Sequence, residues 1–558
     1  MRKHIHYTLL VLLGSAAALA QNGAVQSHVS PLMRQRLQTI SSAYQLATSS
    51  GVIQLSPELI SFYHRNGFTP VWSDMRGLAP CADSLLRAIA SAADHGLDPE
   101  TYHWQAVTHL FARARKHFTT LMIDPELLAE IDILLTDAYM LYGKHLHAGR
   151  YNPHELDAEW YLLKTGADMK VNLLEASGAG TLCESIAALP SPQPEYVRLK
   201  EALARYRRLA QQGGWPAVPE GKKLEKGMWD ERVMALRARL RVTGELGQEP
   251  APVEGTFDDR LVNAVRRFQI AHGLDPDGKV GAATLAALNI TVEERIRQLM
   301  INLERWRWLP RQPGERHIRV NIADFTLEVV ERDSVALFMR VVVGKTYRRT
   351  PVFSDRMTYL VLNPYWNIPT TILLNDIVPK AQKNPDYLRS ENIRVFQGWS
   401  AQAPEIDPAT IDWKKLSKNY LPYRFRQDPG AKNALGRIKF MFPNQFDVYL
   451  HDTPSHSLFN RSRRDFSSGC IRIEKPVDLA LYLLNDPQWT RERMEKLFTT
   501  RIETTLPVRR PILVELIYLT AWVDEAGVVQ FRQDIYERDK NFPIKAPKPA
   551  SLAFLSHP

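Results

Sequence analysis

The sequence predicts a multidomain α+β protein, with helices in the N-terminal half and a β-rich domain in the C-terminal half. A chain of 558 residues is too long for one hydrophobic core, and its length suggests about three or four domains. From about residue 30 to residue 210 the apolar residues recur at helical spacing, whereas from residue 316 onward they alternate as in strands. The composition, with 45% hydrophobic and 24% charged residues, is that of a folded globular protein.

Residues 1–20 have the pattern of a secretory signal peptide. Arg2 and Lys3 precede an apolar run from Tyr7 to Leu13, and Ala18-Leu19-Ala20 is a small-x-small cleavage site. The apolar run is short for a membrane span, and an uncleaved anchor is the alternative. We therefore expect an exported mature chain without a stable membrane span.

The next two units are expected to be helical. Residues 30–210 form a mainly helical domain in which no cluster of reactive side chains stands out, which favours a structural role. A glycine-containing linker leads to a compact three-helix module over residues 224–290, where Asp230 and Asp258 are placed to cap the first two helices. A helical connector from Arg295 to Trp308 follows.

Residues 316–539 are expected to form the β-rich domain. Alternating apolar residues predict strands over 318–322, 327–329, 335–343 and 359–362. The polar, proline-containing insertion over residues 376–430 has its own aromatic residues and predicts either a lid over a site or a surface decoration. The proline- and lysine-rich residues 540–558 are expected to be a loosely ordered tail.

Two segments of the β-rich region place a histidine and a cysteine at strand ends. His451 follows the alternating run Phe446–Leu450, and Cys470 follows a Ser-Gly turn and precedes an apolar run. A thiol needs a nearby base or cation to become a nucleophilic thiolate, and His451 is better fixed than its rival His456, which lies beyond Pro454. A zinc site built from Cys470 and these two histidines is the alternative, but no second cysteine lies nearby.

The cysteine count and the charge are consistent with an exported protein. The chain has 3 cysteines; Cys81 and Cys183 could pair, which would leave Cys470 as a free thiol. The net charge of +10 comes from charges of both signs spread along the chain, without a basic stripe interleaved with aromatic residues, so nucleic acid is not an expected partner. A basic surface suits the polyanionic polymers of a cell envelope.

The His451 segment and the segment Ser467–Ile473 together resemble the catalytic signature of the L,D-transpeptidases. The usual form is Ser/Thr-His-Gly-Cys-x-Arg/Asn, and this sequence has Ser468 in place of the second histidine, as in the large periplasmic branch of the family. Ser468 therefore belongs to the catalytic motif but cannot be its base. The Val-Val-Gly-Lys and Thr-Pro elements, at residues 342–345 and 350–351, also resemble that family.

The resemblance extends to the other units. Residues 30–210 resemble the helical scaffold domain of the large periplasmic branch. Residues 264–284 closely resemble the peptidoglycan-binding domain, a three-helix module of wall enzymes. These matches imply that the chain acts on peptidoglycan stem peptides of the sacculus, in the periplasm.

The resemblance also implies roles for individual residues. Cys470 attacks an amide carbonyl with His451 as base, and backbone N–H groups at Gly469 and Cys470 form the oxyanion hole. Arg472 could hold a peptide carboxylate or make a surface ion pair. Tyr365 and Trp366 lie in an element that lines the family's substrate cleft, although turn packing is their alternative role.

The expected reaction is formation of 3-3 cross-links through a cysteine thioester, and it requires no metal or organic cofactor. Carbapenems are the expected inhibitors because they acylate the same cysteine. Hydrolysis of the thioester, attachment of a lipoprotein, endopeptidase activity and a non-catalytic wall-binding scaffold are the alternatives. The residue pattern alone does not distinguish a stem-peptide amine from water or a protein lysine as the group that accepts the acyl chain.

Overall fold

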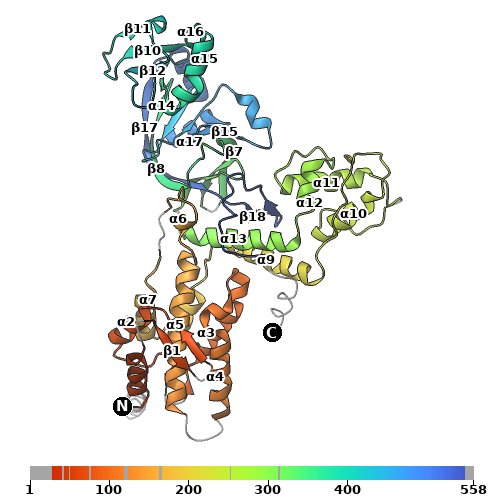
Figure 1. Ribbon diagram of the computed structural model, residues 1–558, viewed down its shortest axis with the longest axis vertical. Helices are drawn as coiled ribbons and strands as arrows, with labels where there is room; N and C mark the ends of the chain where they lie inside the picture. The colour runs from red at the N-terminus through yellow and green to blue at the C-terminus, as the bar shows by residue number, and fades with distance from the viewer. Residues whose placement is uncertain are drawn as a thin grey trace, which may run out of the picture.

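The computed structural model confirms the multidomain α+β architecture (Figure 1). It describes residues 28–40, 43–48, 51–74, 77–117, 124–162, 166–251, 253–311, 314–332 and 334–546. The expected signal peptide lies outside the described residues. Figure 1 shows an N-terminal helical unit at one end, a β-rich unit at the other and a small helical module to one side.

The N-terminal unit is built around the long helix α5, Pro125–Ala148. Its hydrophobic core also receives side chains from the helices that surround α5 and from the flanking short strands. These elements are α2 (Glu58–Arg65), α3 (Pro80–Ala90), α4 (Trp104–His117), α7 (Met169–Ala179), α8 (Leu182–Ala187), η1 (Ser91–His95), η2 (Pro99–Tyr102), β1 (Gln45–Thr48), β2 (Gly51–Gln54) and β4 (Gly77–Leu78). Strand β3 (Ser73–Asp74) pairs with β4, and α6 (Pro153–Leu156) follows α5 and packs Leu156 on the core of the β-rich unit.

Buried polar groups in this unit are matched by hydrogen bonds. Asp132 of α5 is fully buried and accepts the backbone N–H groups of Val71 and Trp72, each at 2.8 Å. The hydroxyl of Tyr63 donates to the same carboxylate at 2.8 Å. Because a buried carboxylate is costly unless it is hydrogen-bonded, this arrangement fixes the loop before β3 to α5.

A disulfide joins Cys81 of α3 to Cys183 of α8, with 5.0 Å between the two Cα atoms. The sequence left this pairing open, and the structure brings the two helices together. Cys470 remains a free cysteine. Export to an oxidising compartment and this bond are mutually consistent.

We expect the double variant Cys81→Ala/Cys183→Ala to lower the stability of the helical unit by roughly 2–5 kcal/mol, because the bond closes a loop of 102 residues in the unfolded chain. Denaturant unfolding of the oxidised wild type and of the variant measures this difference. A reductant should bring the wild type to the variant's midpoint. Equal midpoints for oxidised wild type and variant would show that the bond adds no stability.

The side module consists of α10 (Arg232–Thr243), α11 (Asp259–Ala271) and α12 (Ala282–Leu288), around a core of its own. Asp258 caps α11 as predicted and accepts the N–H of Leu261 at 2.9 Å. Helix α10 has Glu231 at its cap position, one residue later than predicted, but the Asp230 side chain does accept the backbone N–H of Arg232 at 2.9 Å, as a capping residue would. The module contacts the β-rich unit where Arg532 donates to the carbonyl of Ala271 at 3.0 Å.

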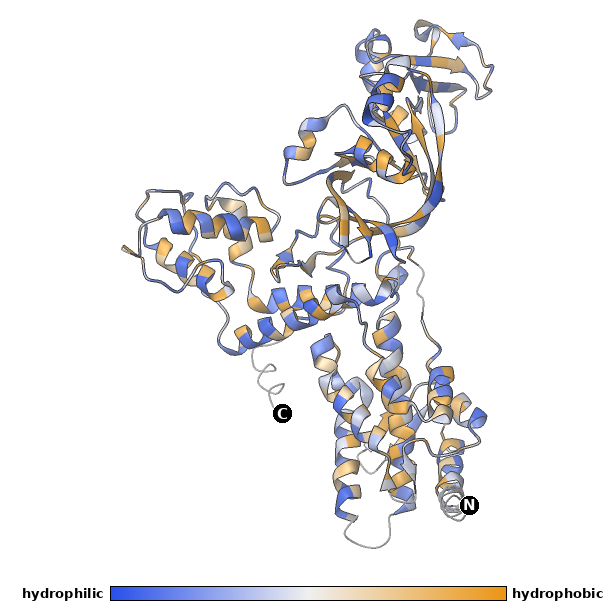
Figure 2. Ribbon diagram, turned by 180° about the vertical axis from the view of Figure 1, so that it is seen from behind, coloured by the Kyte–Doolittle hydropathy of each residue, from blue (hydrophilic) through white to orange (hydrophobic). Residues whose placement is uncertain are grey.

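Helices α9 (Pro194–Gln211) and α13 (Val292–Trp308) lie side by side between the three units (Figure 1). Their apolar side chains share one continuous core with the β-rich unit. Figure 2 shows hydrophilic residues interrupting both helices, and none of the helices in the described ranges is long and apolar enough to cross a membrane. Residues 540–546, expected to be a loose tail, instead pack on α13, where Phe542 stacks on Trp308 with 5.5 Å between ring centroids.

The β-rich unit contains a 9-stranded sheet in the order β15-β7-β16-β14-β13-β8-β17-β5-β6. Because β7 also pairs with β6, the sheet closes on itself. Helices α17 (Pro476–Leu484) and α18 (Arg491–Thr500) follow β16 in the chain. The strands are β5 (Arg316–Asn321), β6 (Thr326–Glu331), β7 (Ser334–Gly344), β8 (Phe353–Leu362), β13 (Ile438–Met441), β14 (Leu450–His451), β15 (Asp465–Ser467), β16 (Ile471–Ile473) and β17 (Thr504–Ile517), with a separate hairpin of β18 (Ala521–Val523) and β19 (Val529–Phe531).

The insertion between β8 and β13 forms a second, 4-stranded sheet with its own hydrophobic core. Figure 1 shows it at the far end of the β-rich unit. The insertion, expected to be a lid or a surface decoration, is thus a folded unit. Its elements are β9 (Trp366–Asn367), α14 (Thr370–Ile372), η3 (Leu373–Ile377), α15 (Val378–Lys383), α16 (Tyr387–Ser390), β10 (Ile393–Gln397), β11 (Glu405–Ile406), η4 (Pro408–Thr410) and β12 (Tyr423–Gln427).

Candidate active site

Strands β14 and β16 bring the predicted histidine and cysteine segments together. The strands are parallel, with Leu450 opposite Ile471 and His451 opposite Arg472. The strand before His451 is shorter than predicted, because Asp447 adopts a positive φ of 52° and the side chain of Asn444 hydrogen-bonds the backbone of Phe446 and Val448. The predicted platform therefore consists of the two residues of β14 alone.

The turn before Cys470 is held by side-chain hydroxyls. Gly469 has a φ of +118°, which favours glycine, and its carbonyl accepts a 2.8 Å bond from the hydroxyl of Thr350. The N–H of Gly469 donates to Ser467 Oγ at 3.1 Å, and Ser467 Oγ in turn donates to the carbonyl of Cys470. The Gly469 N–H, predicted to be an oxyanion donor, is thus already engaged.

The thiol of Cys470 lies beside Tyr449 and Lys439. Its Sγ is 3.7 Å from the carbonyl of Asp447 and within hydrogen-bonding reach of the Tyr449 hydroxyl. The ammonium of Lys439 lies 3.9 Å from the centre of the Tyr449 ring. Burial raises the pKa of the Cys470 thiol, and hydrogen bonds from Tyr449 together with the charge of Lys439 oppose that rise. The resting group is therefore a thiol with partners ready to stabilise its thiolate.

His451 is buried and electrically neutral at rest. Burial, and then the positive charge of Arg472, lower the pKa of its ring to about 3. Its Nδ1 lies 2.5 Å from the carbonyl of Asp452, and among the described residues its ring makes no hydrogen bond to the thiol. A neutral imidazole can accept a proton, and catalytic hydrogen bonds often form only once substrate is bound. The rival His456 lies on the exposed start of η5, His456–Asn460.

Ser468 takes part in a contact that the sequence did not reveal. One guanidinium nitrogen of Arg348 donates to Ser468 Oγ at 2.9 Å and to Asp376 at 2.5 Å. Asp376 belongs to the inserted sheet unit, so Arg348 joins that unit to the residue two positions before the cysteine. In the sequence, the only indication of this contact is the pair Arg348-Arg349 before Thr350.

The other predicted substrate-binding residues lie in two places. Arg472 is half-buried on β16, and its Nε is buried without a hydrogen-bond partner in the described part of the chain. The ring of Tyr365 lies under Arg426, 4.1 Å from its guanidinium carbon, and Trp366 pairs with Gln427 of the inserted sheet. The structure thus places Arg472 on the strand that follows Cys470, opposite His451, and the two aromatic residues at the base of the insertion.

Three family models match the chain. Residues 57–203 match the "Scaffold domain", residues 230–288 the "Putative peptidoglycan binding domain", and residues 315–500 the "L,D-transpeptidase catalytic domain". The last range contains both the histidine and the cysteine segments. This chain carries an L,D-transpeptidase catalytic domain. The resemblance drawn from the sequence is confirmed, including its two accompanying domains.

Individual relatives of the L,D-transpeptidase domain are similar over parts of the chain. A Haemophilus influenzae protein described as "Putative L,D-transpeptidase" is 37% identical over 243 residues, which cover 44% of this chain and 48% of that protein. The match therefore spans about half the length of this relative. Solved L,D-transpeptidase structures from Stackebrandtia nassauensis and Mycobacterium smegmatis are 14% and 13% identical, with TM-scores of 0.21 and 0.17. They cover 54% and 36% of this chain and 96% and 58% of their own chains.

Among the residues that the structure describes, no group of three or more His, Cys, Asp and Glu side chains is arranged to hold a metal ion.

The residues of the candidate site that the sequence did not predict are Tyr449, Lys439, Arg348 and Thr350. Tyr449 and His451 stand two positions apart, so the alternation of a strand would have placed both on one face. Lys439 lies on β13 opposite His451, and no local sequence pattern predicts this pairing.

Proposed function

We propose that this chain is a periplasmic L,D-transpeptidase that forms 3-3 cross-links in peptidoglycan through a thioester on Cys470. The observation that carries the proposal is a free cysteine, inside the matched catalytic domain, at the start of a strand that pairs with the strand carrying His451. Export by the predicted signal peptide and a matched wall-binding module support the periplasmic location and the substrate.

The first half of the reaction acylates Cys470. Its sulfur attacks the carbonyl carbon of the third stem residue while His451 accepts the thiol proton. The tetrahedral oxyanion is stabilised by the N–H of Cys470 and by the Tyr449 hydroxyl, which already reaches the sulfur. Collapse breaks the C–N bond, His451 returns the proton to the departing terminal D-alanine, and a thioester remains.

The second half transfers the acyl group to an amine. A side-chain amine of a neighbouring stem attacks the thioester carbonyl and gives its proton to His451. The C–S bond breaks, the sulfur recovers a proton, and the new amide is the cross-link. Arg472, whose buried Nε has no hydrogen-bond partner among the described residues, is the residue we assign to a stem-peptide carboxylate. Carbapenems should acylate the same sulfur, because they also offer it a reactive carbonyl.

Incubation of the purified protein with tetrapeptide muropeptides tests this function. A 3-3 dimer together with released D-alanine is the expected product. Shorter monomers without dimers would indicate hydrolysis or endopeptidase activity instead. No change in the muropeptides would favour a wall-binding scaffold and would contradict the proposal.

The three-helix module should hold the enzyme on the wall. We expect deletion of residues 229–289 to weaken retention on isolated sacculi several-fold while carbapenem acylation stays within about threefold, because the module has its own core. Sedimentation with sacculi and acylation kinetics measure the two effects. Since the deletion uncovers Phe531, which stacks with His272, Arg532→Ala in the full chain is the control for lost docking alone. Unchanged retention after the deletion would make the module a spacer.

A further inference from the structure

The loop between β7 and β8 and the turn before Cys470 share one buried hydroxyl. Thr350 is fully buried, and its Oγ1 accepts the N–H of Gly344 at 3.0 Å while it donates to the carbonyl of Gly469 at 2.8 Å. One side chain therefore joins the end of β7 to the turn that carries the nucleophile. A valine would fill the same volume without either bond.

The bond to Gly469 also fixes the N–H of the cysteine. The carbonyl of Gly469 and the N–H of Cys470 belong to one planar trans peptide, so they point in opposite directions. Holding the carbonyl against Thr350 turns the N–H away from the protein interior. Within the described part of the chain this N–H has no hydrogen-bond partner, whereas the N–H of Gly469 donates to Ser467. The donor that this turn leaves available is thus the N–H of Cys470, and the bond from Thr350 to Gly469 sets its direction.

The hydroxyl of Tyr536 fixes the backbone of Thr350. It accepts the N–H of Thr350 at 3.2 Å and donates to the carbonyl of Gly344 at 2.5 Å. The two ends of the loop from residue 345 to residue 349 are therefore clamped by one phenol. Tyr536 is itself buried, and burial raises the pKa of its hydroxyl to about 12, so it stays a donor across the physiological range.

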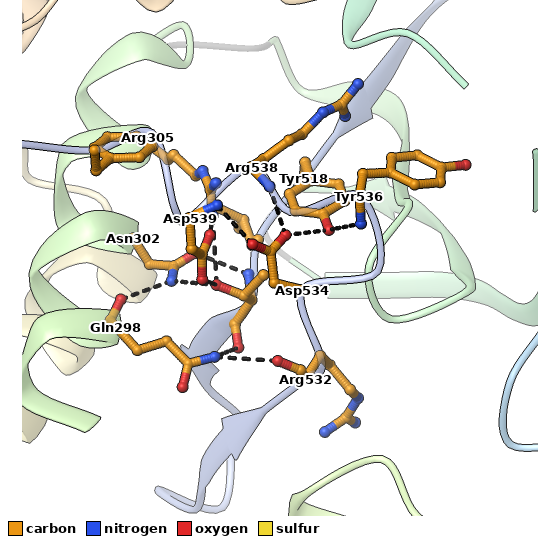
Figure 3. A network of polar contacts seen from close by, with 12 residues as sticks. Gln298, Asn302, Arg305, Tyr518, Arg532, Asp534, Tyr536, Arg538 and Asp539 are labelled. Carbon is orange, nitrogen blue, oxygen red and sulfur yellow. Dashed lines mark hydrogen bonds and ion pairs between the residues drawn. The ribbon is translucent and has the colours of Figure 1, made fainter. Parts of the chain in front are cut away.

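The segment 532–539, which we call the C-terminal strap, anchors Tyr536 to helix α13 (Figure 3). The N–H of Tyr536 donates to the hydroxyl of Tyr518 at 3.0 Å, and that hydroxyl donates to Asp534 at 2.7 Å. The next anchor is Asp539, which forms a 2.6 Å ion pair with the buried Arg305 of α13. Figure 3 shows Asp539 of the strap next to Arg305 and Asn302 of α13, and the Tyr536 ring pointing away from that helix.

We propose that Thr350 and Tyr536 are positioning residues for acyl transfer, which aim the N–H of Cys470 at the oxyanion of the reacting carbonyl. This inference rests on the proposed function and adds two residues that touch neither the substrate nor the sulfur. Because the C-terminal strap is bonded to α13, the direction of the Cys470 N–H would depend on the position of this helix between the domains.

The test compares Thr350→Val, Thr350→Ser and Tyr536→Phe in the full chain. Cross-linking of tetrapeptide muropeptides gives kcat and KM, and alkylation of Cys470 by iodoacetamide reports the thiol without any oxyanion. We expect Thr350→Val and Tyr536→Phe to lower kcat by roughly ten- to a hundredfold, with KM and the alkylation rate within about threefold. Thr350→Ser, which keeps the hydroxyl, should recover most of kcat.

Tyr196→Phe is the matched control, since Tyr196 is equally buried and hydrogen-bonds His95 at 2.9 Å far from the turn in sequence. It should leave kcat within about twofold. An unchanged kcat in Thr350→Val would overturn the inference. So would a parallel fall of kcat and alkylation in both Thr350 variants with a lower melting temperature, since that pattern means general loosening of the fold. A wild type without turnover would refute the proposed function instead.

Discussion

Cys470→Ala should abolish cross-linking, with a fall in turnover of roughly a thousandfold or more, because the variant has no nucleophile to form the thioester. The thermal unfolding midpoint and binding to sacculi should stay close to those of the wild type. Cys470 is the free cysteine, and the disulfide pair lies in the helical unit. Muropeptide turnover, thermal unfolding and sedimentation with sacculi are the three measurements.

Cys470→Ser provides the stricter control for this prediction. It keeps a hydroxyl of similar size at the turn, so the bonds of Ser467 and Thr350 should survive. A serine hydroxyl is a far weaker nucleophile than a thiolate without further activation. Turnover retained by pure Cys470→Ala protein would remove this residue from the mechanism.

His451→Ala should slow acylation by about 10²- to 10⁴-fold at neutral pH, because the site loses the base that takes the thiol proton. The neutral ring carries no charge, so its loss removes a proton acceptor and leaves the electrostatic support from Lys439 in place. His456→Ala is the matched control. The exposed position of His456 predicts a change within about twofold.

The pH profile of carbapenem acylation gives the sign of these effects. With a pKa of about 3, His451 stays deprotonated from mildly acidic to alkaline pH, so the wild-type rate should show no break near the usual histidine pKa. The rate should rise with pH because burial raises the pKa of the thiol. Loss of activity in His456→Ala with activity kept in His451→Ala would reverse the assignment of the base.

Much of this architecture could be predicted from local patterns. Asp258, followed by apolar residues at helical spacing, does cap α11, and the alternating residues after 316 do form the closed sheet. The predictions that were wrong concern positions where long-range contacts or side-chain hydrogen bonds decide the structure. The strand expected before His451 is cut short at Asp447 by the side chain of Asn444, a contact that alternation cannot reveal.

The candidate site shows the same division. Cys470 and His451 could be found because a motif fixes their spacing and chemistry. Lys439, whose charge acts on the thiol, and Thr350, which hydrogen-bonds Gly469, come from strands and loops more than thirty and a hundred residues away in the sequence. The Gly469 N–H was predicted to be an oxyanion-hole donor, but Ser467, two residues earlier, already accepts its hydrogen bond. Such local competition between side chains and substrate is visible only in three dimensions.

The most direct test of the central claim is the mass of the enzyme during turnover. The full chain is incubated with a tetrapeptide stem, quenched in acid and digested, and the Cys470 peptide is analysed by mass spectrometry. We predict a tripeptide acyl group on Cys470 that accumulates without an acceptor amine and disappears when a second stem is added, as the 3-3 dimer appears. Dimer formation with Cys470 unmodified under acceptor-limited conditions, or an acyl group on another residue, would contradict the account.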